Sequence, residues 1–228
     1  MKSRYSVKFI FIYPLFVACL VVQQGDCAEG NDHLFPEQAA VFSGKSKLED
    51  CLRIQKVLKL DDDRDAVVEI VRSRGDSDFT GISDWLISLN REVEDANVRQ
   101  VERRYHYFLE LRLSSKDGSG DPRSTKIEVE KEIAEPFEKS FRQAIVNAHI
   151  PESGKTFLGA SQWLRCHSDQ EGYHSAVMPA FVTPGGNLAV MVRLIDLVET
   201  WLSSGGKDQE MKKRIRESLE KLSAKEFK

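Results

Sequence analysis

Cofactor motifs are absent from this sequence, and their absence removes several classes of enzyme from consideration. There is no phosphate-binding loop, no dinucleotide fingerprint and no haem-attachment motif, because Cys166-His167 lacks a cysteine three residues earlier. Residues 159–163, Gly-Ala-Ser-Gln-Trp, lack the second glycine of a nucleophile elbow. The sequence therefore assigns no catalytic residue and predicts no cofactor.

An excess of basic residues is absent as well. Lys and Arg total 33 against 36 Asp and Glu, which gives a net charge of −3 over 228 residues. Proteins that bind nucleic acid or anionic membranes without specificity need a basic surface. The charge balance argues against a nucleic-acid partner, so we expect the partner to be a protein or a small-molecule ligand whose identity is unknown.

Long hydrophobic runs are missing, and the longest one lies at the N-terminus. Residues 9–22 are mainly apolar, but Pro14 interrupts them, and they fall short of the roughly 20 apolar residues that span a bilayer. A polar stretch follows them, and basic residues precede them at Lys2, Arg4 and Lys8. This layout predicts a secretory signal peptide at residues 1–27.

The cleavage position follows from small residues near the end of that segment. Gly25 and Cys27 occupy the two positions that signal peptidase reads, so we expect Ala28 to become the N-terminus. The protein is then secreted or periplasmic, and it touches a membrane only through the signal segment before cleavage. The alternatives are an uncleaved anchor and a lipid on Cys19 or Cys27.

Cysteine is scarce. The chain has four, and cleavage after residue 27 leaves only Cys51 and Cys166. Two cysteines in an oxidising compartment usually pair, so we expect a Cys51–Cys166 disulfide. Closing so long a loop would stabilise the fold by up to roughly 4–5 kcal/mol. The alternative is two buried free thiols that never meet.

The chain that remains after cleavage is long enough for one globular domain. We divide it into a loose lead-in at residues 28–45, a single α+β domain at 46–206 and a charged amphipathic C-terminal helix at 207–228. The apolar stripe of that last helix is narrow. Such a stripe suits docking onto the domain or weak self-association through residues 207–228.

The first third of the domain is predicted to be mainly helical. Helical and alternating patterns compete in residues 48–60, and we favour a helix. Residues 66–74 can place their apolar side chains on one helix face. Residues 82–93 carry apolar side chains at intervals of three and four, which indicates an amphipathic helix: Ile82, Trp85, Leu86, Leu89 and Val93.

A β-hairpin is predicted next. Apolar residues alternate in 101–113 and again in 127–133, and turn-forming residues separate the two runs. A pairing symmetric about residue 120 sets Leu113 opposite Ile127, Leu111 opposite Val129 and Tyr107 opposite Ile133.

The other face of this hairpin is charged. The same register sets Arg112 opposite Glu128, and it sets Glu110 opposite Glu130 with His106 nearby. Two facing carboxylates and a histidine could hold a cation or share a proton. The alternative is a solvated sheet face on which Arg112 or Lys131 screens the acids.

The rest of the domain adds two helices and a second hairpin. Residues 137–148 have helical spacing, residues 157–182 form two apolar segments around a turn, and residues 188–202 form an almost wholly apolar helix with Asn187 as its N-cap. The predicted fold is therefore a single α+β domain in which one or two antiparallel hairpins pack against three to four helices.

The richest local group of chemically active side chains lies in the turn of the second hairpin: Cys166, His167, Asp169, Glu171 and His174. If Cys166 forms a disulfide, the candidate metal ligands are His167, His174 and Asp169. The alternative is a pair of surface histidines that flank a polar turn.

A noncatalytic binding or interaction module is the function that this sequence favours, because it contains no recognisable catalytic arrangement and fold class alone supplies no reaction. The alternative is a metal-assisted hydrolase that uses the turn between His167 and His174. That enzyme would have to gather both histidines and an acid around a cleft.

Overall fold

The structure is a computed structural model, and it describes nine stretches of the chain: residues 34–37, 45–58, 66–73, 84–94, 104–114, 122–149, 160–168, 172–179 and 186–224. The predicted signal peptide at residues 1–27 lies outside these stretches, and export stays a prediction. None of the helices within the described stretches has the length and apolarity needed to cross a bilayer.

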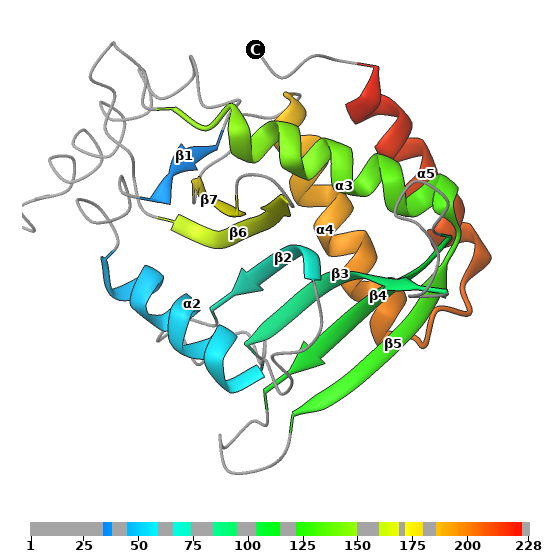
Figure 1. The fold of residues 1–228 in the computed structure, drawn as a ribbon, viewed down its shortest axis with the longest axis horizontal. Coiled ribbons are helices and arrows are strands. Elements are labelled where there is room, and N and C mark those ends of the chain that lie inside the picture. The colour runs from blue at the N-terminus through cyan, green and yellow to red at the C-terminus, as the bar shows by residue number, and fades with distance from the viewer. Residues whose placement is uncertain are drawn as a thin grey trace, which may run out of the picture.

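A seven-stranded antiparallel sheet dominates the described fold (Figure 1). The strands follow the spatial order β1-β7-β6-β2-β3-β4-β5. Their bounds are Phe35–Pro36 for β1, Ala66–Arg72 for β2, Trp85–Val93 for β3, Tyr105–Leu113 for β4, Arg123–Val129 for β5, Ala160–Ser168 for β6 and Gly172–Pro179 for β7. The predicted arrangement of one or two hairpins packed against helices is therefore wrong, because one continuous sheet organises the domain.

Helices cover the two faces of this sheet unequally. One face packs against α3 (Lys131–Val146), α4 (Asn187–Ser203) and α5 (Gln209–Ser223), which together with the strands enclose the larger apolar core. We call it the apolar face. The opposite face packs against α2 (Lys45–Leu58) over a smaller apolar cluster. We call this side the polar face, because its strands also carry buried polar residues, Glu69, Ser88, Asn90, Glu110 and Arg112.

Two of the predicted helices are strands. Residues 66–74 contain β2 and residues 82–93 contain β3. In β2, Ile70 belongs to the larger core and its neighbour Val71 to the smaller one, so both faces of the strand are buried. A strand buried on both faces loses the apolar–polar alternation by which strands are recognised. The three- and four-residue spacing in these segments therefore misled the prediction.

The first predicted hairpin is present as β4 and β5, but its register differs from the predicted one. Leu113 faces Arg123 instead of Ile127, and Tyr107 faces Val129. The shift is four positions, an even number, so every side chain keeps the predicted face. Ile133 is not in the hairpin, because it lies in α3.

Other predicted elements are confirmed. The helix favoured for residues 48–60 is α2, the helices predicted at residues 137–148 and 188–202 are α3 and α4, and the second hairpin is β6 and β7. The predicted N-cap of α4 is wrong by one residue, because Gly186 is the N-cap and Asn187 is the first helical residue. The β6–β7 hairpin joins the first strands through antiparallel pairing of β6 with β2.

The C-terminal helix docks onto the domain. The Asp208 side chain caps α5 by accepting a hydrogen bond from the backbone N–H of Met211. Its apolar stripe is buried in the larger core through Ile215, Leu219 and Leu222. The narrow stripe thus serves contacts within the chain, and self-association through residues 207–228 is not needed to bury it.

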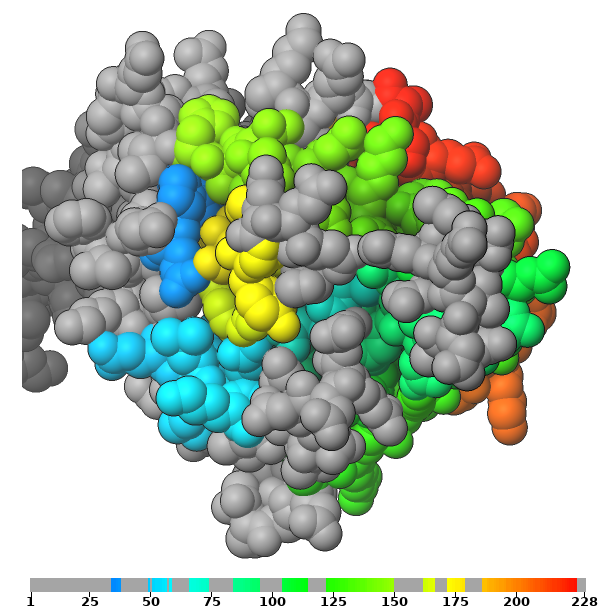
Figure 2. All heavy atoms as spheres, in the orientation of Figure 1, coloured from blue at the N-terminus to red at the C-terminus, as the bar shows by residue number. Residues whose placement is uncertain are grey.

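The predicted lead-in at residues 28–45 contributes to the sheet. Phe35–Pro36 forms β1 and pairs with β7, and the two segments lie side by side in the space-filling view (Figure 2). Leu34 and Phe35 are buried, Leu34 in the larger core and Phe35 in the smaller one. These residues are therefore part of the folded domain.

Candidate functional site

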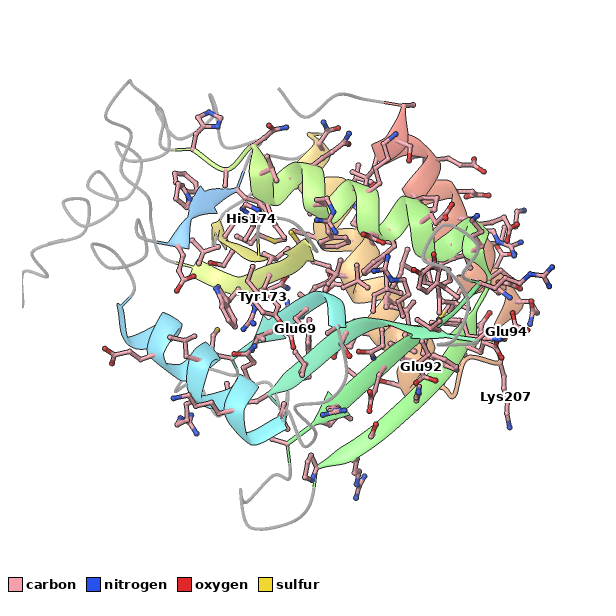
Figure 3. The ribbon with its side chains drawn as sticks, viewed as in Figure 1. Glu69, Glu92, Glu94, Tyr173, His174 and Lys207 are labelled. Carbon is pink, nitrogen blue, oxygen red and sulfur yellow. The ribbon has the colours of Figure 1, made fainter. Side chains whose placement is uncertain are left out.

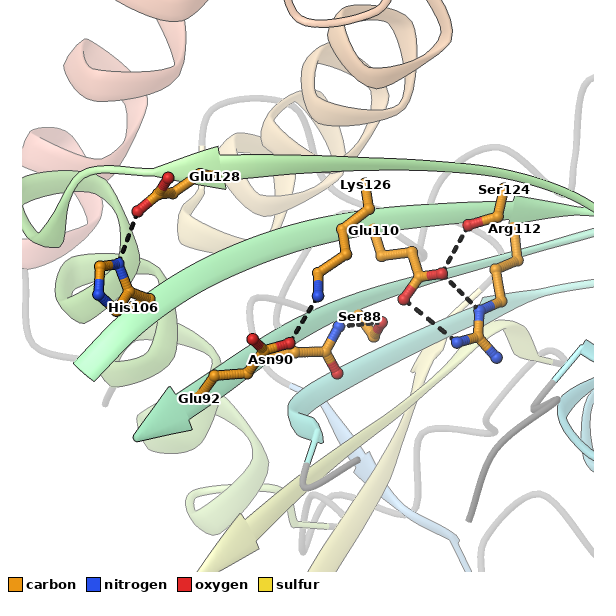
Figure 4. Close-up of polar contacts among 9 residues, drawn as sticks. All are labelled: Ser88, Asn90, Glu92, His106, Glu110, Arg112, Ser124, Lys126 and Glu128. Carbon is orange, nitrogen blue, oxygen red and sulfur yellow. Dashed lines mark hydrogen bonds and ion pairs between the residues drawn. The ribbon is translucent and has the colours of Figure 1, made fainter. Parts of the chain in front are cut away.

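The polar face of β3, β4 and β5 holds a network of hydrogen-bonded and charged side chains (Figure 4). The register places Ser88, Glu110 and Lys126 in one row across the three strands. The row continues to Glu69 on β2. Neighbouring rows supply the remaining members of the network, namely Asn90, Glu92, His106, Arg112, Ser124 and Glu128.

The buried part of the network centres on Glu110 and Arg112 of β4, which are only 3% and 6% exposed. Arg112 donates from Nε to Glu110 Oε1 at 2.9 Å and from Nη2 to Oε2 at 3.2 Å. Ser124 on β5 donates to Glu110 Oε1 at 2.5 Å. The carboxylate is therefore held by a two-point ion pair and a hydroxyl, the geometry in which a guanidinium binds most strongly.

Arg112 also fastens α2 to the sheet. Its Nη1 donates to the backbone carbonyl of Leu58, the last residue of α2, at 2.7 Å. The final carbonyls of a helix have no partner within the helix, and a cation there complements the helix dipole. The buried ion pair thus has a structural task, because it anchors the C-terminal end of the helix that covers this face.

A second buried carboxylate, Glu69, lies on β2 opposite Arg165 of β6 (Figure 3). Gln55 of α2 donates to Glu69 Oε2 at 2.9 Å, and Arg165 of β6 places its Nε 3.7 Å from the same oxygen. The Arg165 guanidinium also lies 3.4 Å from the ring centroid of Tyr173 on β7. Glu69 therefore ties α2 to β2 through an amide, while Arg165 provides positive charge beside it.

The exposed part of the network lies toward the ends of β3 and β5. Lys126 Nζ is 2.6 Å from Glu92 Oε1 and 3.9 Å from the ring centroid of Phe108. His106 Nδ1 lies 2.8 Å from Glu128 Oε1, and both side chains are about half exposed. We call Glu92, Phe108, Lys126, His106 and Glu128 the exposed strip.

Acidic neighbours control the protonation of His106. The hydrogen bond with Glu128 is the largest influence and raises the pKa of His106 above its ordinary value. The charges of Glu128, Glu94 and Glu92 raise the pKa further. The strip therefore favours imidazolium and carries alternating opposite charges beside an aromatic ring, a surface suited to polar recognition.

The predicted carboxylate pair is separated in the structure. Glu110 faces Lys126 in the β4–β5 register, whereas Glu130 is the N-cap residue of α3 and lies beyond β5. Glu130 binds Lys212 of α5 at 2.5 Å, and this hydrogen bond lowers the pKa of the Glu130 carboxyl. Neither acid lies opposite the other, so the predicted cation or shared-proton site is not formed.

The predicted disulfide is also not formed. Cys51 and Cys166 are both buried, and no disulfide joins them. Cys51 of α2 belongs to the smaller cluster and Cys166 of β6 to the larger core, so the sheet lies between them. Burial raises the pKa of the Cys166 thiol, which disfavours the reactive thiolate. This arrangement matches the alternative of two buried thiols.

The predicted metal ligands do not converge among the described residues. The register pairs His167 with Tyr173 and His174 with Cys166. Successive strand positions alternate between faces, so positions 167 and 174 belong to opposite faces of the hairpin. Asp169 lies outside the described residues. Across the described stretches, no group of three or more His, Cys, Asp or Glu residues is arranged to hold a metal ion.

Sequence reasoning missed Glu69 and the link from Arg112 to α2. A signal for Glu69 was present, because it is the lone charge inside the apolar run Val67-Val68-Glu69-Ile70-Val71, and a buried acid needs a partner. Arg112 was predicted to lie opposite Glu128 or to screen the acids, whereas it lies opposite Ser124. Its contact with the carbonyl of Leu58 joins residues distant in the chain, and no local pattern reveals it.

Comparisons with known proteins identify no relative: no protein-family model, no curated protein and no solved structure matches the chain.

Proposed function

We propose that this protein is an exported, noncatalytic binding or interaction module. Export rests on the N-terminal sequence, where basic residues precede an interrupted apolar run and a polar stretch. The noncatalytic part rests on how the acids and bases of the polar face are used. Arg112 binds Glu110 and the end of α2, and Glu69 binds Gln55 of α2, so these groups hold the fold together.

The observation that carries this proposal is the buried pairing of Glu110 with Arg112. A general acid or base must be able to gain and lose a proton near the operating pH. The Glu110 carboxylate accepts two hydrogen bonds from a guanidinium and one from a hydroxyl, so both of its oxygens are engaged inside the fold. Ser124 donates its hydroxyl hydrogen to Glu110, and the Ser88 hydroxyl accepts a hydrogen bond from Asn90. In these bonds neither serine is paired with a histidine, as a serine nucleophile would be.

The exposed strip is the surface that we assign to ligand contact. Phe108 is partly buried with the Lys126 ammonium over its ring, and around it Lys126, Glu92, His106 and Glu128 offer donors and acceptors that are accessible to solvent. Charged groups around an aromatic side chain recur at recognition surfaces. The metal-assisted hydrolase receives less support, because positions 167 and 174 belong to opposite faces of the β6–β7 hairpin.

A site-specific photocrosslinker tests the binding surface. We would introduce p-benzoylphenylalanine at Phe108 in the exported protein, and at Val146 as a control, because Val146 is 57% exposed at the end of α3 and remote from the strip. Irradiation in the native extracellular or periplasmic milieu should give an adduct of defined mass at position 108 only. No adduct at 108, or equal adducts at both positions, would count against the strip.

Activity measurements test the noncatalytic part. The purified protein with added Zn²⁺, or with a chelator, should hydrolyse ester, peptide and phosphate reporter substrates no faster than buffer does. Metal-dependent hydrolysis that is lost in His174→Ala would overturn the proposal in favour of the hydrolase. Intact-mass analysis of the exported protein separately tests export, with Ala28 as the expected first residue.

A further inference from the structure

The outer edge of β5 is an open edge of the sheet. β5 is the last strand in the spatial order, and no other described strand pairs with its outer side. An open strand edge presents backbone N–H and C=O groups that can pair with another chain. The question is whether the side chains of Arg123–Val129 guard this edge or favour a particular partner.

A second copy of the same strand is a charge-complementary partner in one register. Antiparallel pairing about Ile127 sets Lys126 opposite the partner's Glu128, and Glu128 opposite the partner's Lys126. On the apolar side, Thr125 then faces the partner's Val129. A register shifted by two residues in either direction would set Lys126 or Glu128 against its own copy, and like charges directly opposite each other are unfavourable.

We propose that two copies of this protein pair through their β5 edges, antiparallel and centred on Ile127, and so join two seven-stranded sheets into one. A twofold axis perpendicular to the sheet keeps the polar faces of both copies on one side. The two exposed strips then lie next to each other across the joint. This inference does not rest on the proposed binding function.

Lys126 does not guard the edge in the usual way. Lysine on an edge strand commonly prevents strand addition by projecting a charge toward the incoming chain. Here the ammonium reaches back over β4, where it contacts the Phe108 ring, and pairs with Glu92 on β3. The ammonium is thus directed away from an incoming strand, and its three donors allow a further acceptor to bind.

The contact area of this pairing is one short strand, so the dimer should be weak and depend on concentration. Analytical ultracentrifugation of the full mature chain from micromolar to submillimolar concentrations should show reversible dimerisation. Lys126→Glu and Glu128→Lys should each weaken dimerisation roughly tenfold or more, because each sets like charges opposite each other twice. Circular dichroism would confirm that both variants are folded.

Mixing the two variants gives the decisive result. Lys126→Glu carries acids at both positions and Glu128→Lys carries lysines at both, so their mixture should form a heterodimer although neither variant dimerises alone. Local damage to Glu92 or His106 contacts could not produce that recovery. A monomeric wild-type protein at the highest concentration, or a mixture that stays monomeric, would overturn the proposal.

Lys213→Glu is the matched control, because Lys213 is 67% exposed on α5 and remote in sequence from β5. This variant should dimerise like the wild type. Loss of the dimer in Lys213→Glu, together with its retention in Lys126→Glu, would place the contact on the C-terminal helix and overturn the β5 interface. A failed dimer would leave the crosslinking and hydrolysis tests of the proposed function unaffected.

Discussion

The two faces of the sheet are stabilised in different ways. On the apolar face, three helices bury a continuous set of aliphatic and aromatic side chains, whose stabilisation scales with the apolar area removed from water. On the polar face, one helix is held by a small apolar cluster together with buried hydrogen bonds from Gln55 and Arg112. A buried polar contact depends on both partners, since removing one leaves the other without compensation.

Arg112→Met tests this difference with the largest expected effect. The change leaves the Glu110 carboxylate buried without its cation and removes a donor from the Leu58 carbonyl at the end of α2. We expect a loss of about 3–5 kcal/mol in the free energy of unfolding, the usual cost of breaking a buried ion pair from one side. Urea denaturation followed by circular dichroism measures it.

The double variant Glu110→Leu/Arg112→Met sharpens the comparison. It removes both charges, so most of the lost stability should return, because a buried pair contributes little over apolar residues of similar volume. On the apolar face, Leu109→Ala should cost about 2–5 kcal/mol through the cavity it leaves. A double variant as unstable as Arg112→Met would show that the two faces do not differ as argued.

The connection between α4 and α5 tests packing on the apolar face. Gly206 has a φ of +72°, and a Cβ built on it would overlap the side chain of Ile127. Gly206→Ala should cost roughly 2–4 kcal/mol, since left-handed strain and overpacking add. Gly205 has a φ of +76° with no atom within 4 Å of such a Cβ, so Gly205→Ala should cost only about 1–2 kcal/mol. Equal melting temperatures for the two variants would exclude the overlap with Ile127.

The contact between Glu130 and α5 predicts a dependence of stability on pH. The folded pKa of Glu130 is lowered, chiefly by its hydrogen bond from Lys212. Its contribution to stability is therefore present above the unfolded pKa and is lost as the pH falls through the folded pKa. Glu130→Gln should remove this part of the pH dependence of the free energy of unfolding. The change should be under about 1 kcal/mol, because the carboxylate is 46% exposed. Denaturation curves of both proteins between neutral and acidic pH measure the change, and parallel curves would contradict it.

The smallest effect on stability is expected for the contact of His106 with Glu128 in the exposed strip. Its folded pKa is raised, so its contribution to stability is present below the unfolded pKa and is lost as the pH rises through the folded pKa. Glu128→Gln removes the carboxylate that is the main cause of the raised pKa, so the pKa of His106 should fall. An NMR titration of the imidazole resonances follows this directly. His149, which follows the C-terminal end of α3 and donates from its backbone N–H to Leu34, serves as the reference resonance.

The sequence patterns predicted those elements that expose one side. β4 alternates because its polar-face residues, such as His106 and Glu110, contrast with Tyr107 and Leu109. α3 and α5 each have a solvent face and were found for the same reason. The prediction failed for β2 and β3, because most of their residues are buried on both faces of the sheet. Their sequences therefore lack the alternation of apolar and polar residues that marks a half-buried strand.

The candidate site was predictable in part. The charged face of the β4–β5 hairpin was expected, and an even shift of register preserved it. The partners were wrong, since a shift of four residues replaces Glu130 by Lys126 opposite Glu110. Register depends on the turn that joins the strands and on which side chains each face buries. The packing of α2 against the smaller cluster places Cys51 on the opposite side of the sheet from Cys166.

The position of β2 has a consequence for folding rate. β2 pairs with β3, which follows it closely in the chain, and with β6, where Val68 meets Cys166 after four intervening elements. Local hairpins form quickly, whereas pairings between distant segments require costly loop closure and slow the search. We therefore expect the β2–β6 junction to close late. Until then the β2–β5 and β6–β7 segments each expose an unpaired strand edge. During synthesis the sheet cannot be completed until β6 has left the ribosome, because β2 pairs with it.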